Sequence, residues 1–139
     1  MRLPLPELLL ALALCAALTV AMRAGLISRS ALEPLQGRIL RLEADGIGFG
    51  VKVTLWKNAF HPAFGSPDVT IRAAPRDYLS LALRREDPDT LFFTRRLVME
   101  GDTDLGLIVK NALDAVDWDA LPAPLARLSA RLSARLAGH

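Results

Sequence analysis

Residues 87–111, DPDTLFFTRRLVMEGDTDLGLIVKN, decide the fold class and indicate what kind of site this chain carries. Asp87 and Asp102 stand where helix N-caps are expected, and Pro88 takes a first helical position, where a missing N–H costs nothing. Between the two helices, residues 97–100 predict a strand that ends at a glycine. The segment holds no nucleophile paired with a base and no set of metal ligands. It therefore predicts the apolar wall of a cavity rather than a reaction centre.

Extended runs and turn signals upstream of this segment predict the rest of a sheet. Asp45-Gly46 is a strong hairpin signal, because both residues tolerate a positive φ, and Lys57-Asn58 reads as the next turn. In the second run, residues 47–56, apolar residues alternate with small or polar ones, so this sheet should have one buried face. The four extended runs are residues 38–44, 47–56, 59–64 and 68–73.

Helices are expected after the strands. One begins at Pro75, a short one begins at Pro88, and a third is capped near Asp102. The apolar face of the third helix holds Leu105, Ile108, Val109, Ala112, Leu113 and Val116. Together these elements predict an α+β fold, with a mostly antiparallel sheet of about five strands that helices cover on one face.

The N-terminal run of residues 8–22 carries no charge and allows three interpretations. It suits a secretory signal, with Thr19-Val20-Ala21 as a cleavage site of small residues. It also suits a membrane anchor through residues 3–22, although a span needs about 20 apolar residues. The third interpretation is a buried helix that starts after two prolines, with Glu7 in its first turn, where the helix dipole favours an acid.

The C-terminus repeats the unit Ala-Arg-Leu-Ser from residue 126 onward. At helical spacing, Leu128, Leu132 and Leu136 form one stripe and Arg127, Arg131 and Arg135 form another beside it. Such a helix either docks on anionic lipid headgroups or packs on the domain with its arginines in solvent. The chain is thus divided into an N-terminal apolar helix (1–29), a central domain (30–120) and a basic amphipathic helix (121–139).

Composition and motifs favour neither catalysis, nor a metal site, nor nucleic acid. The net charge of +2 is too small to attract nucleic acid, and Cys15 is the single cysteine. Gly46, Gly48 and Gly50 lack the spacing of a nucleotide loop and read as one turn residue and two places of close approach to the sheet. His61 reads as a surface residue. The acids Glu100, Asp102 and Asp104 are better explained by capping than as a metal site, and no cofactor is expected.

Two stretches, RREDPDTLFF at 84–93 and RRLVMEGDTDLGLIVKN at 95–111, resemble the C-terminal half of the sterol carrier protein type 2 lipid-binding domain. LQGR at 35–38 and AVDW at 115–118 also match that family. Within it, the chain resembles the bacterial accessory factors of oxygen-independent ubiquinone biosynthesis, over about residues 30–120. The apolar first helix, the glycine-free second turn and the arginine–leucine repeat depart from the family pattern. The resemblance favours the buried helix among the three N-terminal interpretations.

The resemblance implies a non-catalytic protein that binds isoprenoid quinone intermediates or phospholipid in a hydrophobic cavity. It implies presentation of that lipid to other ubiquinone biosynthesis proteins, including the paired iron–sulfur hydroxylase subunits, in the cytoplasm or peripherally at the inner membrane. The alternatives are a scaffold for those enzymes, without lipid transfer, and an exported or membrane-anchored lipid carrier.

Apolar periodicity supplies the candidate lipid contacts, and arginine chemistry supplies the candidate contacts with headgroups or membrane. The expected lipid contacts are Trp56, Phe92, Phe93, Leu97, Leu105, Ile108, Val109 and Leu113. The expected headgroup or membrane contacts are Arg95, Arg96, Arg127, Arg131 and Arg135.

Overall fold

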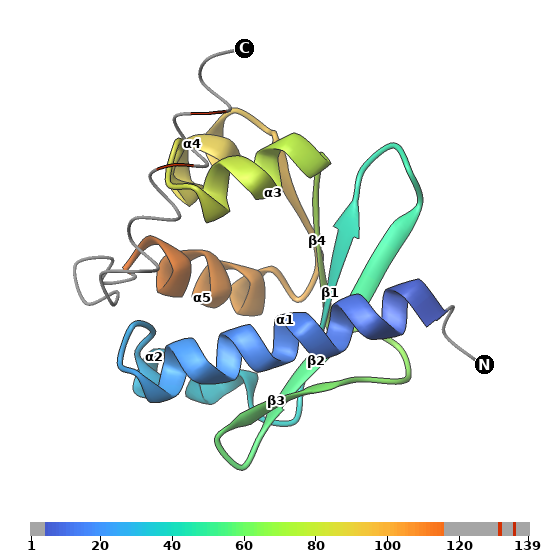
Figure 1. Cartoon of the computed structure of the whole chain (residues 1–139), viewed down its shortest axis with the longest axis vertical. Coiled ribbons are helices and arrows are strands. Elements are labelled where there is room, and N and C mark those ends of the chain that lie inside the picture. The colour runs from blue at the N-terminus through green and yellow to red at the C-terminus, as the bar shows by residue number, and fades with distance from the viewer. Residues whose placement is uncertain (1–4, 116–130, 132–134, 136–139) are drawn as a thin grey trace.

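The computed structural model describes residues 5–115, 131 and 135. Its centre is one five-stranded sheet with the strand order β3-β2-β1-β4-β5 (Figure 1). The strands are β1 (Ile39–Ala44), β2 (Phe49–Trp56), β3 (Ala59–Pro62), β4 (Val69–Ala73) and β5 (Leu97–Gly101). The predicted C-terminal helix of residues 121–139 lies outside the described residues, except for Arg131 and Arg135, which are helical and exposed.

The sheet is mixed. Strand β1 pairs antiparallel with β2 and parallel with β4, while β2–β3 and β4–β5 are antiparallel. The α+β class and the mostly antiparallel pairing expected from the sequence are confirmed. The parallel pair, which aligns Leu40 with Val69 and Ala44 with Ala73, was not predicted.

The two hairpin turns differ from their sequence signals. The β1–β2 turn is longer than the predicted Asp45-Gly46 pair: Ala44 faces Phe49, so residues 45–48 form the loop, and Gly46 and Gly48 have φ of +87° and +63°. The expectation that the second strand starts at residue 47 was therefore wrong. The β2–β3 turn is the two-residue connection expected, with Lys57 and Asn58 both in the left-handed region.

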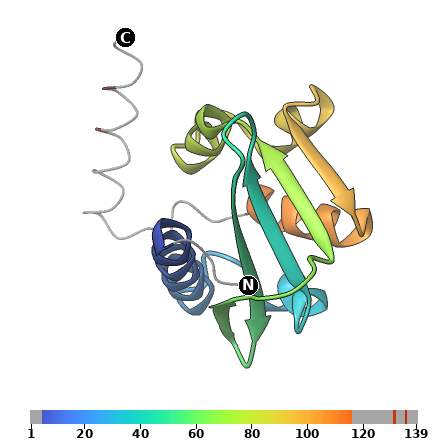
Figure 2. The ribbon, with the colours of Figure 1, turned by 90° about the vertical axis from the view of Figure 1, so that its right-hand side faces the viewer.

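Helices gather on one face of the sheet, as predicted; in Figure 2 the strands face the viewer and α5 lies behind them. Asp87 caps α4 by accepting from the Thr90 N–H, and Asp102 caps α5 by accepting from the Leu105 N–H. The helices are α1 (Leu5–Arg23), α2 (Arg29–Leu32), the 3₁₀ helix η1 (Glu33–Leu35), α3 (Pro75–Ala82), α4 (Pro88–Phe93) and α5 (Thr103–Asp114).

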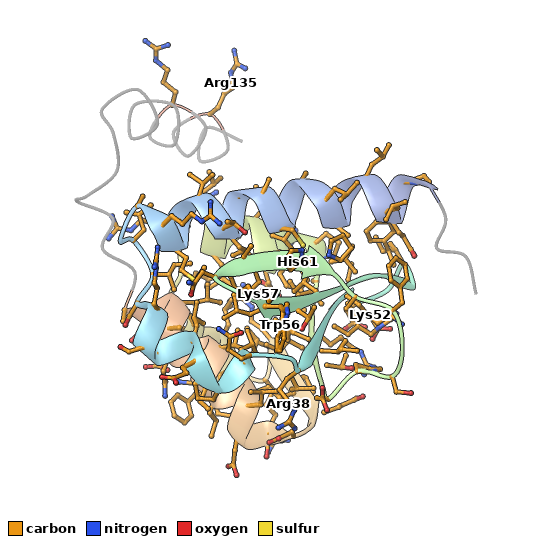
Figure 3. All side chains as sticks on the ribbon, turned by 90° about the horizontal axis from the view of Figure 1, so that it is seen from below. Arg38, Lys52, Trp56, Lys57, His61 and Arg135 are labelled. Atoms are coloured by element: carbon orange, nitrogen blue, oxygen red, sulfur yellow. The ribbon has the colours of Figure 1, made fainter. Side chains whose placement is uncertain are left out.

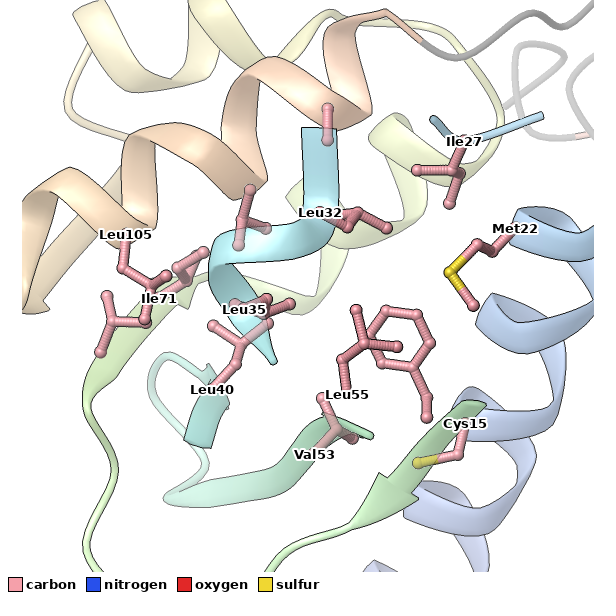
Figure 4. Packing of buried hydrophobic residues seen from close by; sticks show 14 of the residues in the cluster. Cys15, Met22, Ile27, Leu32, Leu35, Leu40, Val53, Leu55, Ile71 and Leu105 are labelled. Atoms are coloured by element: carbon pink, nitrogen blue, oxygen red, sulfur yellow. The ribbon is translucent and has the colours of Figure 1, made fainter. Parts of the chain in front are cut away.

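The core lies between the helices and the inner face of the sheet, and Figure 4 shows part of its packing. Alternation along β2 places Val51, Val53 and Leu55 in the core, which confirms the predicted buried face. The opposite face carries a ladder of ion pairs, in which Arg72 joins Glu43 and Glu100. Burial and ion pairing thus separate the two faces by residue type.

The first helix is buried on one side only. Ala11, Cys15 and Met22 belong to the buried core, while Leu9, Leu12 and Val20 are exposed. Residues 6–23 form a helix that is long and apolar enough to cross a membrane. A single helix of this kind near an N-terminus is only weak evidence for a membrane span. The expectation of a buried helix therefore holds for one face of α1 only.

Candidate lipid-binding site

The candidate site is the apolar layer where α4 and α5 meet the inner face of β4 and β5. Leu97 from β5 and Leu105 and Val109 from α5 are buried there in one cluster with Val69 and Ile71 of β4. Helix α5 lies close to the strands, because a Cβ on Gly106 would stand 2.7 Å from the Met99 sulfur. Three of the predicted lipid contacts thus converge on one layer.

Three more predicted contacts are half-buried at the margin of this layer. Phe92 and Leu113 pack against the core cluster, and Ile108 lies on α5 with part of its side chain in solvent. A half-buried apolar margin is where a lipid chain can replace water without rebuilding the core, since burial of each CH₂ contributes about 0.8 kcal/mol. The core cluster gathers five of these six side chains, Ile108 precedes the buried Val109 on the same helix, and lipid contact by all six stays a prediction.

Trp56 and Phe93 lie outside this layer, which corrects the expectation that they line its wall. Leu55 points into the core, so the pleat turns Trp56 to the opposite, helix-free face, where it is 53% exposed. Phe93 is the last residue of α4 and is 77% exposed, although its ring stacks edge-on against Phe92 at 5.4 Å. Trp56 follows the inward-facing Leu55, so the alternation along β2 already indicated that Trp56 points away from the core.

Lys110 is a site residue that the sequence interpretation missed. Its side chain is buried on α5, and its Nζ forms an ion pair with Asp89 and donates to Asn111 Oδ1 at 3.0 Å. The Nζ also lies 5.6 Å from the centre of the Phe92 ring, within reach of a cation–π contact. A buried ammonium group requires such partners. The sequence did hold a signal for this ion pair, because Lys110 interrupts an apolar helix face and acids precede it in the chain.

Two of the three acids near Lys110 have structural roles. The carboxylate oxygens of Asp87, Asp89 and Asp114 lie within 4.8 Å of one another. Asp87 caps α4, and its hydrogen bond from the Thr90 hydroxyl holds the pKa of that carboxyl below its usual value. Asp89 neutralises Lys110. Capping and ion pairing therefore explain two of the three acids.

Arg96 is bound to neighbouring acids instead of facing a headgroup. Its guanidinium donates to Glu86 at 2.6 Å and to the buried Asp77 at 2.5 Å. Hydrogen bonds to the two carboxylates raise the pKa of Arg96 above its usual value, and the bond to Glu86 has the larger effect. The expectation of a headgroup contact is therefore not supported for Arg96. Arg95 is exposed with φ +62°, and no interaction of its side chain occurs within residues 5–115.

Tyr78 of α3 joins the two parallel strands beside the site. Its hydroxyl lies 2.8 Å from the Glu43 carbonyl of β1 and 3.0 Å from the Ile71 carbonyl of β4. Burial raises the pKa of Tyr78 to about 12. The ring therefore remains neutral and fixes the ends of β1 and β4 at physiological pH. His61 is exposed, with its Nε2 3.3 Å from the Trp56 carbonyl, in agreement with a surface role.

Comparisons with known proteins agree with this geometry. The model of the SCP-2 sterol transfer family matches residues 19–114. The ubiquinone biosynthesis accessory factor UbiT of Escherichia coli strain K12 is 50% identical over 109 residues, which cover 73% of this chain and 59% of UbiT. The chain thus spans about three fifths of the length of that relative.

Two solved structures share the fold. The UbiJ-SCP2 ubiquinone synthesis protein has a TM-score of 0.62 at 18% identity and covers 78% of this chain and 96% of its own. The sterol carrier protein domain 2 of Helicoverpa armigera has a TM-score of 0.52 at 16% identity, with coverage of 84% and 98%. The family model, the identity to UbiT and the five-stranded sheet with its helical layer agree with the resemblance seen in the sequence. The chain belongs to the SCP-2 sterol transfer family.

Proposed function

We propose that this protein is a non-catalytic lipid-binding accessory factor of ubiquinone biosynthesis that acts in the oxygen-independent route. In this role it holds isoprenoid quinone intermediates or phospholipid and presents them to pathway enzymes, including the iron–sulfur hydroxylase pair. The observation that carries the proposal is the 50% identity to UbiT over 109 residues, together with the match of the SCP-2 family model. The proposed place of action is the cytoplasm, with peripheral contact at the inner membrane.

The apolar layer supports the lipid-binding part of the proposal. A polyprenyl chain is costly to leave in water, at about 0.8 kcal/mol for each CH₂. Leu105 and Val109 offer an apolar interior, and the half-buried Phe92, Ile108 and Leu113 lie at its margin. Lys110 and Asp89 supply a polar end to this margin, suited to a quinone head group.

Solvent extraction and mass spectrometry of the purified full chain test the lipid directly. Ile108→Trp should fill the margin of the layer and reduce the co-purified quinone precursor or phospholipid about tenfold, because the added ring competes for the same volume. Leu107→Trp is the matched control, since Leu107 is exposed on the same helix. Absence of any lipid in the wild type, both as purified and after addition, would refute the carrier role.

Quinone profiling of a deletion strain tests the pathway. Loss of ubiquinone only in cultures without oxygen, restored by the wild-type gene, is the expected result. Full restoration by a margin-filling variant that carries no lipid would favour a scaffold role. Unchanged quinone in both conditions would contradict the proposed pathway and leave only the lipid-binding domain.

A further inference from the structure

The helix-free face of the sheet carries two different charge patterns. On β1, β4 and β5 opposite charges neutralise one another, because Arg72 forms ion pairs with Glu43 and Glu100. In the connection from β1 to β4, residues 46–67 contain two lysines and a histidine but no Asp or Glu. Positive charge is therefore concentrated on β2, β3 and their turn.

Three basic side chains and a tryptophan share this end of the face, and we call them the hairpin patch: Lys52, Trp56, Lys57 and His61. Alternation along β2 turns Lys52 and Trp56 away from the core. His61 of β3 is paired with the β2 residue midway between them, and Lys57 follows Trp56 in the turn. Figure 3 shows the four side chains gathered at this end of the sheet.

No acid among residues 5–115 neutralises the hairpin patch. Lys52 donates to the Gly65 carbonyl at 2.6 Å, which is an uncharged acceptor, so two of its three N–H groups stay free. Lys57 and His61 form no ion pair within the same residues. The charge of the patch is therefore available to an external carboxylate.

The ring of Trp56 is exposed and yet held in position. The Gly37 N–H donates to the Leu55 carbonyl at 2.8 Å, and a Cβ on Gly37 would stand 3.7 Å from the Trp56 ring. One side of the ring thus lies against the backbone, while 53% of the residue stays in solvent. A ring that is already positioned loses little conformational entropy when a partner covers it, and tryptophan is enriched among the residues that dominate interface energies.

We propose that the hairpin patch docks on an acidic surface of a protein partner, namely an enzyme that receives the lipid. This inference rests on the proposed function, in which the carrier presents its lipid to such enzymes. Trp56 enters an apolar pocket of the partner at the centre of the contact, and Lys52 and Lys57 contact carboxylates around that pocket. An aromatic anchor at the centre and charges at the rim are the usual anatomy of a protein–protein interface.

The position of the hairpin patch suits presentation of a lipid. The patch lies on the helix-free face, whereas the apolar layer lies between the other face of the sheet and helices α4 and α5. A partner bound to the patch therefore leaves Phe92, Ile108 and Leu113, at the margin of the layer, uncovered. Lipid can then enter or leave the layer while the two proteins stay bound.

Cross-linking gives a sharp test, because the chain has only three lysines. A carbodiimide joins an amine to a carboxylate that touches it, without a spacer. When the full chain is mixed with the purified iron–sulfur hydroxylase pair, Lys52 or Lys57 should be linked to an Asp or Glu of the pair. Lys110 is the internal control: it is buried beside Asp89 and should be linked to that residue alone. Binding without any link from Lys52 or Lys57 would contradict an acidic contact.

Biolayer interferometry with the same hydroxylase pair tests the individual residues. Trp56→Ala should weaken binding about thirtyfold and Lys57→Glu about tenfold, whereas Lys57→Arg should bind like the wild type because it keeps the charge. Added salt should weaken the wild type more than Lys57→Glu. Because Trp56 packs on Gly37, the melting curve of Trp56→Ala is compared with that of the wild type, and Lys57→Glu at the turn gives an independent answer.

Matched controls lie near α4, away from β3 (Figure 1). Phe93→Ala removes an aromatic ring that is more exposed than Trp56, and Arg85→Glu reverses an exposed charge. Both variants should bind the hydroxylase pair like the wild type. Equal losses in these controls would overturn the assignment to the hairpin patch.

The outcomes separate the hairpin patch from the proposed function. Unchanged binding by Trp56→Ala and Lys57→Glu would refute the patch and leave the proposed function standing, while no binding by the wild type would refute presentation to this pair and the patch with it. If the two variants lose only their binding to vesicles of phosphatidylcholine and phosphatidylglycerol, the patch contacts lipid and the protein partner is refuted. Variants that release the pair but keep their co-purified lipid, measured by mass spectrometry, support the proposal.

Discussion

At the scale of single residues, Tyr78 gives the most direct test, because it is the only tyrosine in the chain. Absorbance of the phenolate should appear near pH 12 in the folded protein and near pH 10 in the denatured protein. Between these values the unfolded chain releases a proton that the folded chain keeps, so stability should fall as pH rises from 10 to 12. A folded protein that titrates near pH 10 would contradict the burial of this ring.

Removal of the Tyr78 hydroxyl separates its hydrogen bond from its titration. Tyr78→Phe should cost about 1 kcal/mol at pH 7, since the Glu43 and Ile71 carbonyls lose their partner. The same variant should lose less stability than wild type above pH 10. Urea unfolding at pH 7 and at alkaline pH measures both effects.

Gly101 shows a second constraint set by one residue. Its φ is +90°, and a Cβ built there would stand 2.7 Å from the Asp68 carbonyl oxygen. Gly101→Ala should therefore destabilise the fold by roughly 2–4 kcal/mol, from left-handed strain plus a backbone clash. Gly46→Ala is the matched control, because Gly46 has a similar φ of +87° in open space. Equal losses in urea unfolding would exclude the steric contribution.

At the scale of elements, the β2–β3 turn retains conformational strain. Lys57 and Asn58 have φ of +51° and +63°, the conformation that glycine adopts without cost. Asn58→Gly should leave stability nearly unchanged, because Asn tolerates this region. Lys57→Gly should stabilise by roughly 0.5–1 kcal/mol, because lysine tolerates it less. Thermal unfolding and amide exchange in β3 check this order, and a stabilised Asn58→Gly with an unchanged Lys57→Gly would contradict it.

Local signals predicted the elements, and long-range contacts escaped prediction. Asp87 and Asp102 cap helices as expected, because a cap depends on residues within one turn. The parallel pairing of β1 with β4 depends on strands joined through β2 and β3, which no local pattern specifies. The Arg96 partners lie 10 and 19 residues away, so spacing alone could not separate an ion pair from a headgroup contact.

At the scale of the whole molecule, lipid should stabilise the fold, because a ligand that binds only the folded state adds to its free energy. At a free ligand concentration 100 times Kd the gain is about 2.7 kcal/mol. Removal of bound lipid should therefore lower Tm, and return of a quinone precursor should restore it. Ile108→Trp should abolish this shift while Leu107→Trp preserves it. A Tm independent of lipid in the wild type would contradict a ligand-filled interior.

The family and the layer that gathers the candidate site were predictable, whereas the outward-facing surface was not. Leu97, Leu105 and Val109 follow helix and strand periodicity into the core. The exposed side of α1 could not be predicted, because a helix apolar on all sides gives no phase to show which side packs. Packing against β2 and β3 selects Ala11 and Cys15 as the inward side.

The burial of Cys15 has a practical consequence for kinetics. It is the only thiol in the chain, and it lies in the core where α1 meets the sheet, where burial raises its pKa. A thiol reagent can therefore modify the protein only when α1 lifts from the strands or the chain unfolds. The modification rate, divided by that of an unfolded peptide, gives the equilibrium constant for this opening. Cys15 thus reports how often α1 detaches from the sheet, without any engineered probe.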